Sequence, residues 1–279
     1  MSIELAEFLD RHQRIFVLTG AGVSTASGIP DYRDESGAWK HQRPMELREF
    51  VASHAARQRY WARSCLGWER FRRARPNAAH AALARLEVLG KLSRLVTQNV
   101  DGLQQLAGSR RVTELHGSLA RVDCLDCGQS VARGQIQQRL LDANPVLGDL
   151  SAKPAPDGDA LLQDFDSDLV EVPACAGCGG VLKPAVVFFG ETLAPQCVRE
   201  CNDALAQSDA VLVAGSSLMV YSGFRLVRDA ARLKLPVFVI NRGKTRADEL
   251  IDCKLEQDCG AALSAATAKL NPAPESAVF

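Results

Sequence analysis

The residues with the most evident chemistry in this chain are two pairs of cysteines. Cys124 and Cys127 form one Cys-x-x-Cys motif, Cys175 and Cys178 form a second, and a glycine follows each pair. Four thiolates complete the tetrahedral coordination of Zn²⁺ and leave no position open for water, so the pairs predict a structural zinc site. A redox role is the competing interpretation, which the presence of two pairs disfavours.

A second candidate site is the stretch 20–33, which reads GAGVSTASGIPDYR and follows an apolar run over residues 15–19. A buried strand that runs into glycines and the start of a helix can place a phosphate at the helix N-terminus. Gly20 and Gly22 would let backbone N–H groups approach a pyrophosphate. The fingerprint of dehydrogenases has a third glycine where this chain has Thr25, so the loop fits a dinucleotide but departs from the hydride-transfer pattern. A tight turn without a ligand is the alternative.

Polar residues also follow other predicted strands. The apolar run 92–97 leads into Gln98, Asn99 and Asp101, and a short strand over 112–115 leads into His116. In an open parallel sheet the carboxyl ends of strands form the ligand crevice, where these side chains would meet. A helix cap is the alternative for Asn99 and Asp101, and a lone histidine is more often structural than catalytic.

Two later strands repeat the pattern. Residues 210–214 run into the turn Gly215-Ser216-Ser217, and residues 236–240 run into Asn241. Several strand-end turns on one rim predict a cofactor crevice.

The remaining elements must position these residues. We expect a short amphipathic helix over 1–10, a helix over 76–90 that begins at a proline and ends at a glycine, and an alanine-rich closing helix over about 260–270, followed by a Pro/Ser-rich tail. The segment 39–75 predicts two or three helices over a cleft. The proline- and aspartate-rich stretch 144–172 predicts an inserted loop outside the core.

Composition narrows the class of protein. The chain has 279 residues, 47% of them hydrophobic, and 33 basic residues balance 33 acidic ones. This balance disfavours nucleic-acid and membrane-surface partners. The sequence shows no apolar run of about 20 residues that would span a bilayer and no N-terminal targeting pattern. Together with the metal-type cysteine pairs, this favours a reducing, cytoplasmic location.

We therefore predict an α/β fold, a Rossmann-like parallel sheet with helices on both faces, plus a small zinc-ribbon and helical module. The expected boundaries are 1–40, 74–120 and 183–279 for the Rossmann-like, dinucleotide-binding domain. Residues 41–73, a helical cap, and 121–182, the zinc-binding module, would form the small domain.

These motifs together resemble the sirtuins, a family of NAD-dependent protein deacylases, over nearly the whole chain. The motifs that carry the resemblance are the loop 20–33, with Tyr32 where many members have Phe, TQNVD at 97–101, the His-Gly pair at 116–117, the cysteine pairs, FGE at 189–191, GSSL at 215–218 and NRG at 241–243. The stretches 57–63 and 108–116 and the long insertion are most similar to class II, the lineage of one mitochondrial sirtuin. Because residues 1–10 do not resemble a presequence, we expect a bacterial relative.

The resemblance implies that the chain uses NAD and one structural Zn²⁺ and acts on acylated lysine side chains of proteins. His116 would be the general base for a ribose hydroxyl, with Asn99 and Asp101 completing the catalytic set. Ile29 and Asp31 would hold nicotinamide, and Ser216, Asn241 and the backbone near Cys259 would hold adenosine. The full implied cofactor set is Gly20, Ala21, Gly22, Ser24, Ile29, Asp31, Tyr32, Arg33, Gln98, Asn99, Asp101, Gly215, Ser216, Ser217, Asn241, Arg242, Gly243 and Cys259. The substrate peptide would lie as a strand against Val187, Phe188, Phe189, Gly190 and Glu191.

The acyl group is left open. Tyr60 and Arg63 have the Tyr-x-x-Arg spacing that binds acidic acyl groups in another sirtuin branch, and Arg63 could pair with an acyl carboxylate. Alternatively, Arg63 is one of many surface arginines on its helix.

The alternative functions are ADP-ribosyl transfer to protein, a lipoamidase-type or acidic-acyl deacylase, and a zinc-ribbon binding module that uses the nucleotide only as a sensor.

Overall fold

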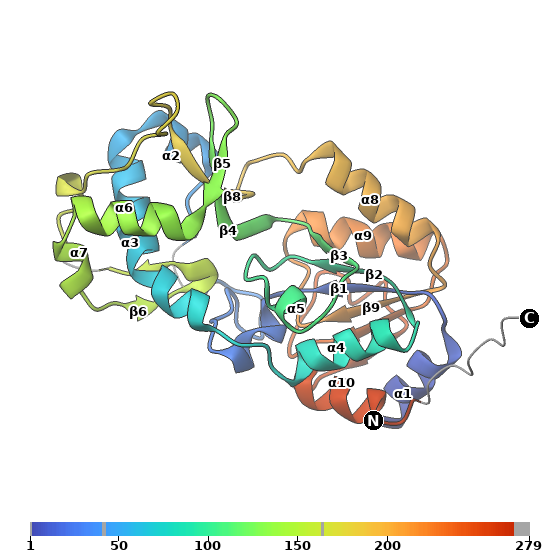
Figure 1. The fold of residues 1–279 in the computed structure, drawn as a ribbon. Coiled ribbons are helices and arrows are strands. Elements are labelled where there is room, and N and C mark those ends of the chain that lie inside the picture. Colours follow the sequence, from blue (N-terminus) through green and yellow to red (C-terminus); the bar gives the residue numbers. More distant parts are fainter. Residues whose placement is uncertain (1, 41–42, 163–164, 271–279) are drawn as a thin grey trace, which may run out of the picture.

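A six-stranded parallel sheet forms the centre of the computed structural model, which describes residues 2–40, 43–162 and 165–270 (Figure 1). The strand order is β11-β10-β9-β1-β2-β3. The chain builds one half outward from β1 and then returns to build the other half on the opposite side, so the order reverses at β1. Ligands of such sheets bind at this switch point, outside the carboxyl ends of the strands. The strands are β1 (Ile15–Thr19), β2 (Leu92–Thr97), β3 (Val112–Glu114), β9 (Ala210–Ala214), β10 (Val237–Ile240) and β11 (Cys253–Leu255).

Helices cover both faces of this sheet, which explains why β1 is apolar at every core position. Ile15 and Val17 point to one face and Phe16 and Leu18 to the other, and all four are fully buried. The first face is packed by α1 (Ser2–Arg11), α4 (Ala78–Val88) and α10 (Cys259–Thr267), the second by α8 (Pro195–Ala206) and α9 (Tyr221–Arg232). The predicted Rossmann-like fold class is confirmed, and α1, α4 and α10 match the expected helices.

The glycine-rich loop after β1 does not start an α-helix. Two single turns of 3₁₀ helix follow instead, over Ala21–Val23 and Thr25–Ser27. Gly28 ends the second turn in the left-handed conformation, at φ 83°, and Pro30 cannot continue a helix. The backbone after the second turn is therefore irregular where it passes the switch point. The prediction that a helix begins in this loop was wrong.

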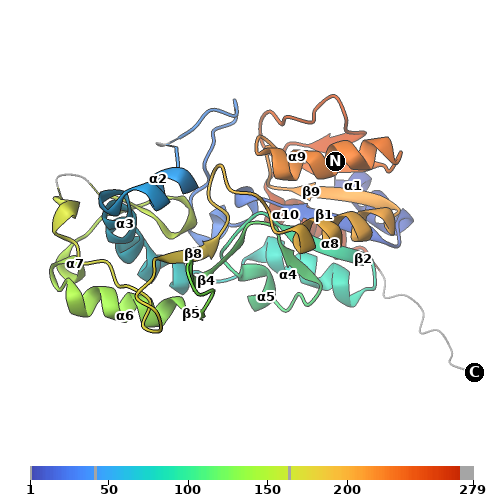
Figure 2. The ribbon, with the colours of Figure 1, turned by 90° about the horizontal axis from the view of Figure 1, so that it is seen from above.

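A smaller part of the molecule, at the left of Figures 1 and 2, joins helices to an antiparallel sheet of order β5-β4-β8. Trp61, Val122, Ile136 and Leu182 are buried in its core. Its elements are α2 (Leu47–Ala52), α3 (His54–Arg73), α6 (Arg133–Ala143), β4 (Gly117–Cys124), β5 (Ser130–Ala132) and β8 (Leu182–Val186), and a short α5 (Leu103–Leu106) follows β2. Residues 39–75 thus supply two of the two or three helices expected.

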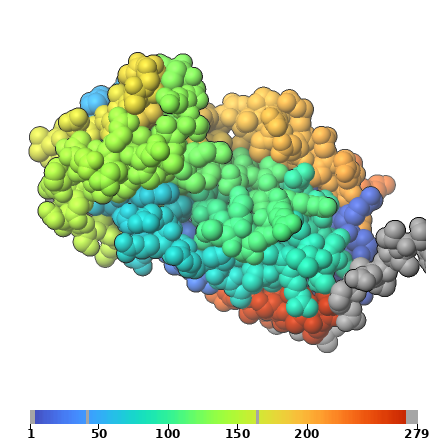
Figure 3. All heavy atoms as spheres, in the orientation of Figure 1, coloured from blue at the N-terminus to red at the C-terminus, as the bar shows by residue number. Residues whose placement is uncertain are grey.

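The stretch 144–172 is more ordered than a loop. It contains α7 (Val146–Asp149), β6 (Lys153–Pro154), a 3₁₀ turn over Pro156–Gly158, β7 (Ala160–Leu161) and a 3₁₀ turn over Ser167–Leu169. Leu147 and Val170 are buried in the same core as Trp61, and the amide of Gln58 donates to the carbonyls of Asp168 and Val170 at 2.7 and 2.9 Å. In the space-filling view the stretch 144–172 lies with α6 at one end of the molecule (Figure 3). Placing this stretch outside the core was wrong.

No helix within the described ranges is both long and apolar enough to cross a bilayer. The predicted tail over 271–279 lies outside the described residues.

Candidate active site

Two glycine turns meet at the switch point. The N–H of Gly22 donates to the carbonyl of Gly215 at 2.8 Å. A Cβ added to Gly20 would lie 2.8 Å from that carbonyl oxygen and from Cβ of Ser216, and Gly215 itself has φ 62°. The turns after β1 and β9 therefore pack backbone against backbone, which only glycine permits.

A cavity of about 1080 Å³ opens over these turns. It lies at the upper end of the size range of ligand pockets, which suits a dinucleotide together with a second substrate. The predicted site residues that line it are Gly20, Ala21, Gly22, Ile29, Asp31, Tyr32, Arg33, Gln98, Asn99, His116, Val187, Phe188, Phe189, Gly190, Glu191, Gly215, Ser216, Ser217, Asn241, Arg242 and Cys259.

Ser24 and Asp101 lie directly behind this lining. The Ser24 hydroxyl donates to Asp101 Oδ2 at 2.7 Å and accepts from Asn99 Nδ2 at 3.0 Å, while the same amide group donates to the carbonyl of Gly20 at 3.1 Å. Asp101 Oδ1 also accepts from the N–H of Leu103 at 2.9 Å. The cap of α5 is Gly102, so neither Asn99 nor Asp101 is the N-cap as the alternative had it. The Asp101 carboxylate instead anchors Ser24 and through it Asn99.

His80 extends this network, although the sequence analysis did not select it. Its Nδ1 accepts from the N–H of Asn77 at 3.2 Å, and its Nε2 lies 3.5 Å from the hydroxyl of Ser24. Complete burial lowers the pKa of His80, which keeps the imidazole neutral. Its only sequence signal was the spacing to the helix cap Asn77.

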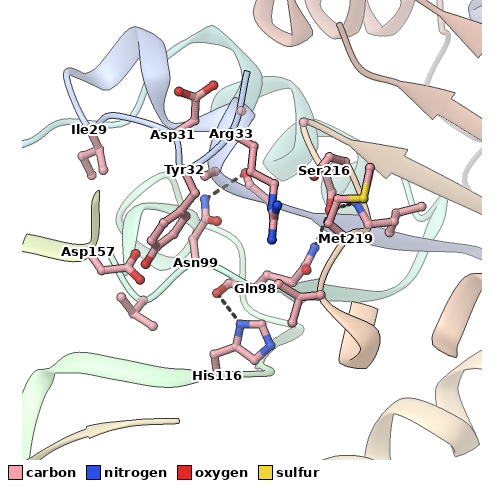
Figure 4. Close-up of a pocket in the computed structure, with 18 of the residues that line it drawn as sticks. Ile29, Asp31, Tyr32, Arg33, Gln98, Asn99, His116, Asp157, Ser216 and Met219 are labelled. Carbon is pink, nitrogen blue, oxygen red and sulfur yellow. Dashed lines mark hydrogen bonds between the residues drawn. The ribbon is translucent and has the colours of Figure 1, made fainter. Parts of the chain in front are cut away.

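The imidazole of His116 lies on the floor of the cavity (Figure 4). Its Nδ1 is 3.0 Å from the carbonyl oxygen of Gln98, and its Nε2 is 2.8 Å from the hydroxyl of Ser222, a residue that the sequence analysis did not select. Because a carbonyl can only accept, Nδ1 carries the proton and Nε2 is the free base. Burial lowers the pKa of His116, and the Gln98 carbonyl opposes this in part. The imidazole is therefore neutral, with Nε2 able to accept a proton.

Gln98 connects the two halves of the crevice. Its amide donates to the carbonyl of Thr19 at 3.2 Å and to the hydroxyl of Ser216 at 2.8 Å. On the adenosine side of the implied site, the amide of Asn241 donates to the carbonyl of Arg242 at 2.8 Å. Gly243 does not line the cavity but packs under it against the backbone of Glu35.

The segment after the glycine loop forms another wall. Arg33 lies over the ring of Trp39, 3.8 Å from its centroid, and Trp39 packs edge-on against Tyr32 and Phe189. Asp31 pairs with Lys40 at 2.6 Å. Trp39 and Lys40 are further lining residues that the sequence analysis missed.

The stretch 187–191 continues from β8 as irregular backbone that lines the cavity, with an isolated bridge between Phe189 and Glu46. The N–H of Val187 donates to the carbonyl of His116, and the carbonyl of Phe189 accepts from Leu47, each at 2.9 Å. Glu191 pairs with the buried Lys183 at 3.0 Å and accepts from the N–H of Phe188 at 2.8 Å. The Glu191 carboxylate therefore fixes the shape of this segment.

Tyr60 and Arg63 are not among the described residues that line the cavity. Tyr60 packs against Phe50 and Phe188 with centroids 5.4 and 5.2 Å apart, and burial raises the pKa of its phenol. Arg63 pairs with Asp159 of the 144–172 insertion at 3.1 Å.

The four cysteines of the two motifs converge. Sγ of Cys124 is 3.5 Å from Sγ of Cys178, Sγ of Cys127 is 3.8 Å from Sγ of Cys175, and all four sulfurs lie within 4.8 Å of one another. Tetrahedral Zn²⁺ with Zn–S bonds of about 2.3 Å requires sulfurs about 3.8 Å apart. The donor set and its spacing fit one structural zinc ion.

Together, the doubly wound sheet, the crevice at its switch point and the four-cysteine module define the class of dinucleotide-binding α/β proteins with a structural zinc site. The comparison with known proteins is specific: a model of the Sir2 family matches residues 20–222, and the chain belongs to this family.

Named relatives support the same assignment. The chain is 53% identical to NAD-dependent protein deacetylase 2 of Bradyrhizobium diazoefficiens, over 93% of this chain and 95% of that protein. It is 55% identical to the NAD-dependent protein deacetylase of Xanthomonas campestris pv. campestris, over 93% and 89%. It is 48% identical to the mitochondrial NAD-dependent protein lipoamidase sirtuin-4 of Bos taurus, over 92% and 82%. The predicted class II character is thereby confirmed.

Solved structures agree. A Sir2 enzyme described with its mechanism and regulation superimposes with a TM-score of 0.76 at 33% identity, over 96% of this chain and 98% of that one. A Sir2 complex with a p53 peptide and NAD⁺ gives 0.74 at 28% identity, over 94% and 95%.

Proposed function

We propose that this protein is an NAD-dependent protein-lysine deacylase that transfers the acyl group of a modified lysine to ADP-ribose and releases nicotinamide. The observation that carries the proposal is the position of neutral His116. Its unprotonated Nε2, which accepts from the Ser222 hydroxyl, lies in one cavity with the glycine turns and with the segment 187–191. The relatives named as deacetylases support the same reaction.

The residues of the chain suit this chemistry. When bound, NAD supplies an electrophilic ribose carbon that the acyl-lysine amide oxygen can capture. His116 would take a proton from a ribose hydroxyl at Nε2, whose lowered pKa keeps it unprotonated near neutral pH. The glycine turns would admit the pyrophosphate against backbone N–H groups.

The buried network would orient the reacting sugar. Asn99 is fixed by Ser24 and Gly20, and Ser24 is fixed by Asp101. We infer that Asn99 touches the ribose and leaving group, and that Asp101 acts through Ser24 as a positioning residue. Ile29 and Asp31 would hold the nicotinamide ring and carboxamide.

The peptide substrate would add a strand at the segment 187–191. Backbone hydrogen bonding of this kind gives affinity with modest dependence on the substrate side chains. We infer acylated lysines of proteins as the partners, without nucleic acid or membrane, because the chain's basic and acidic residues balance. A cytoplasmic location fits four thiolates kept reduced for zinc.

The experiment is turnover of purified protein with NAD and a set of acyl-lysine peptides that includes acetyl- and lipoyl-lysine. Release of nicotinamide together with O-acyl-ADP-ribose is expected. The similarity to a lipoamidase makes lipoyl-lysine the second candidate substrate. Intact mass separates the alternative, because ADP-ribosyl transfer adds mass to the acceptor protein whereas deacylation removes it. No nicotinamide release with any peptide would refute the proposal.

A further inference from the structure

One cationic side chain on the wall of the cavity has no part in the reaction described above. Arg225 lies on α9 and lines the cavity, three residues beyond Ser222. Residues three apart are neighbours on one face of a helix. Because the hydroxyl of Ser222 is 2.8 Å from Nε2 of His116, Arg225 lies about one helical turn from the serine that contacts the base.

The positive charge of Arg225 is not paired within the fold. Its Nη2 is buried without a hydrogen-bond partner among the residues that the structure describes. Asp229, one turn further along α9, pairs instead with Arg228 at 2.9 Å. Glu191, which lines the cavity as well, pairs with Lys183 at 3.0 Å. A buried donor without an acceptor costs free energy, so this guanidinium is suited to receive an acceptor from a ligand.

The thiols of α8 near Arg225 supply no negative charge. Burial raises the pKa of Cys197, and the charge of Arg225 opposes this only in part. Burial, with the neighbouring Cys197, raises the pKa of Cys201 to about 12, so both thiols are neutral at physiological pH. Glu200, whose charge also acts on these thiols, accepts from the amide of Gln196 at 3.1 Å. An anion for Arg225 is therefore left to a ligand.

Two walls of the cavity lead toward Arg225. The segment 187–191 is followed by Val198 of α8, and the turn 215–218 is followed by Arg225 of α9, and all of these residues line the cavity. The helices α8 and α9 pack against each other. A substrate peptide that lies between these two walls would therefore pass Arg225 on its way out of the cavity.

The spacing of an extended peptide relates Arg225 to one position of the substrate. Side chains alternate along a strand, so the second residue from the acyl-lysine points to the same side as the lysine, about 7 Å along the chain. A helix rises about 4.5 Å over three residues, which is the separation of Ser222 and Arg225 along α9. The long side chain of arginine covers the difference.

Building on the proposed function, we propose that Arg225 selects protein substrates that carry an aspartate or glutamate two residues from the acylated lysine. The carboxylate accepts charge-assisted hydrogen bonds from the guanidinium. These bonds form when the peptide binds and do not involve the reacting atoms, so the selection acts on KM rather than on kcat.

The test uses acyl-lysine peptides of one sequence that carry Glu or Gln two residues before or two residues after the lysine. For each peptide, kcat and KM of nicotinamide release are measured in the wild type, in Arg225→Gln and in the matched control Arg232→Gln. Glutamine keeps a long polar side chain without the charge. The control removes an exposed arginine from the last turn of the same helix.

We expect the wild type to prefer Glu over Gln by at least about 5-fold at one of the two positions, as for a partly buried charged hydrogen bond. The preference should lie in KM and should decrease at high salt. Arg225→Gln should bring each pair within about 2-fold, whereas Arg232→Gln should keep the wild-type ratio. Equal rates for Glu and Gln at both positions in the wild type would overturn the proposal, as would an unchanged preference in Arg225→Gln.

Two further outcomes separate this proposal from neighbouring ones. A higher KM for NAD in Arg225→Gln, with the peptide preference intact, would overturn it and assign Arg225 to the cofactor. The absence of turnover with every peptide would refute the proposed function instead. In that case the affinities of labelled Glu and Gln peptides, measured by fluorescence anisotropy with NAD present, still decide the role of Arg225. The wild-type ratio decides even if Arg225→Gln does not fold.

Discussion

The hydroxyl of Ser222 donates a hydrogen bond to the unprotonated Nε2 of His116 across 2.8 Å. Ser222 stands in the first turn of α9, so a helix from the second half of the sheet holds a base that follows β3 in the first half. With the Gln98 carbonyl on Nδ1, the Ser222 hydroxyl fixes the orientation of the imidazole.

Replacing Ser222 tests this contact. Ser222→Ala removes the hydrogen bond that orients the imidazole, so kcat/KM at pH 8 should fall, by less than about 10-fold. The acid limb of the profile should keep its position, because a serine hydroxyl can donate to the neutral imidazole and accept from the protonated one. Ser130→Ala, on the exposed β5, is the control. An unchanged kcat/KM would show that Ser222 does not orient the base.

Removing the base itself should separate binding from chemistry. His116→Ala should lower kcat by about 10²- to 10⁴-fold, the usual contribution of a general base. Its affinity for NAD, measured by calorimetry, should change little, because the glycine turns remain. Retained turnover would exclude His116 from the reaction.

The cysteine cluster should act through stability. Cys178→Ala removes one of four zinc ligands, and structural zinc contributes about 10–16 kcal/mol in small zinc domains, with less expected here because one module lies in a larger fold. Zinc content should fall and the melting temperature with it. Cys253→Ala, outside the cluster, should keep the metal. Normal melting of metal-free protein would contradict a structural role.

Asp157 should make stability depend on pH. Burial, with the neighbouring charge of Asp159, raises the pKa of Asp157 to about 7. The folded state therefore binds a proton that the unfolded chain has already lost, and stability decreases as pH rises through this window.

Asp157→Asn removes the ionisable group. It should raise the melting temperature at pH 8, corresponding to about 1–3 kcal/mol, and raise it less at pH 5. Thermal melts beside the control Asp149→Asn, which removes one exposed carboxylate from the same insertion, would measure the difference. Destabilisation at pH 8 would show that the ionised carboxylate already has a partner in the fold.

The sequence predicted the rim of the sheet well because apolar runs mark buried strands and the residues after them must share one edge. This placed His116, Asn99 and Ser216 around one cavity. It also brought the cysteine pairs together, since their spacing reports directly on metal ligation.

The sequence did not predict the side chains whose positions depend on contacts with residues far away in the chain. Arg63 is paired with a residue 96 positions away in an insertion that lacked periodicity. Asp157 lies in the 3₁₀ turn Pro156–Gly158 and Ser222 in the first turn of α9. Both line the cavity, although neither comes directly after a strand of the six-stranded sheet. Such placements are set by tertiary packing, which neither composition nor spacing encodes.

The contact between Gly20 and Gly215 has a consequence for how the chain matures on the ribosome. Gly20 is made near the start of synthesis and Gly215 only after most of the chain, so the contact can form only once strands from both halves of the sheet exist. The cysteine module is translated entirely between these two events. It is therefore available to take up its metal before the crevice exists.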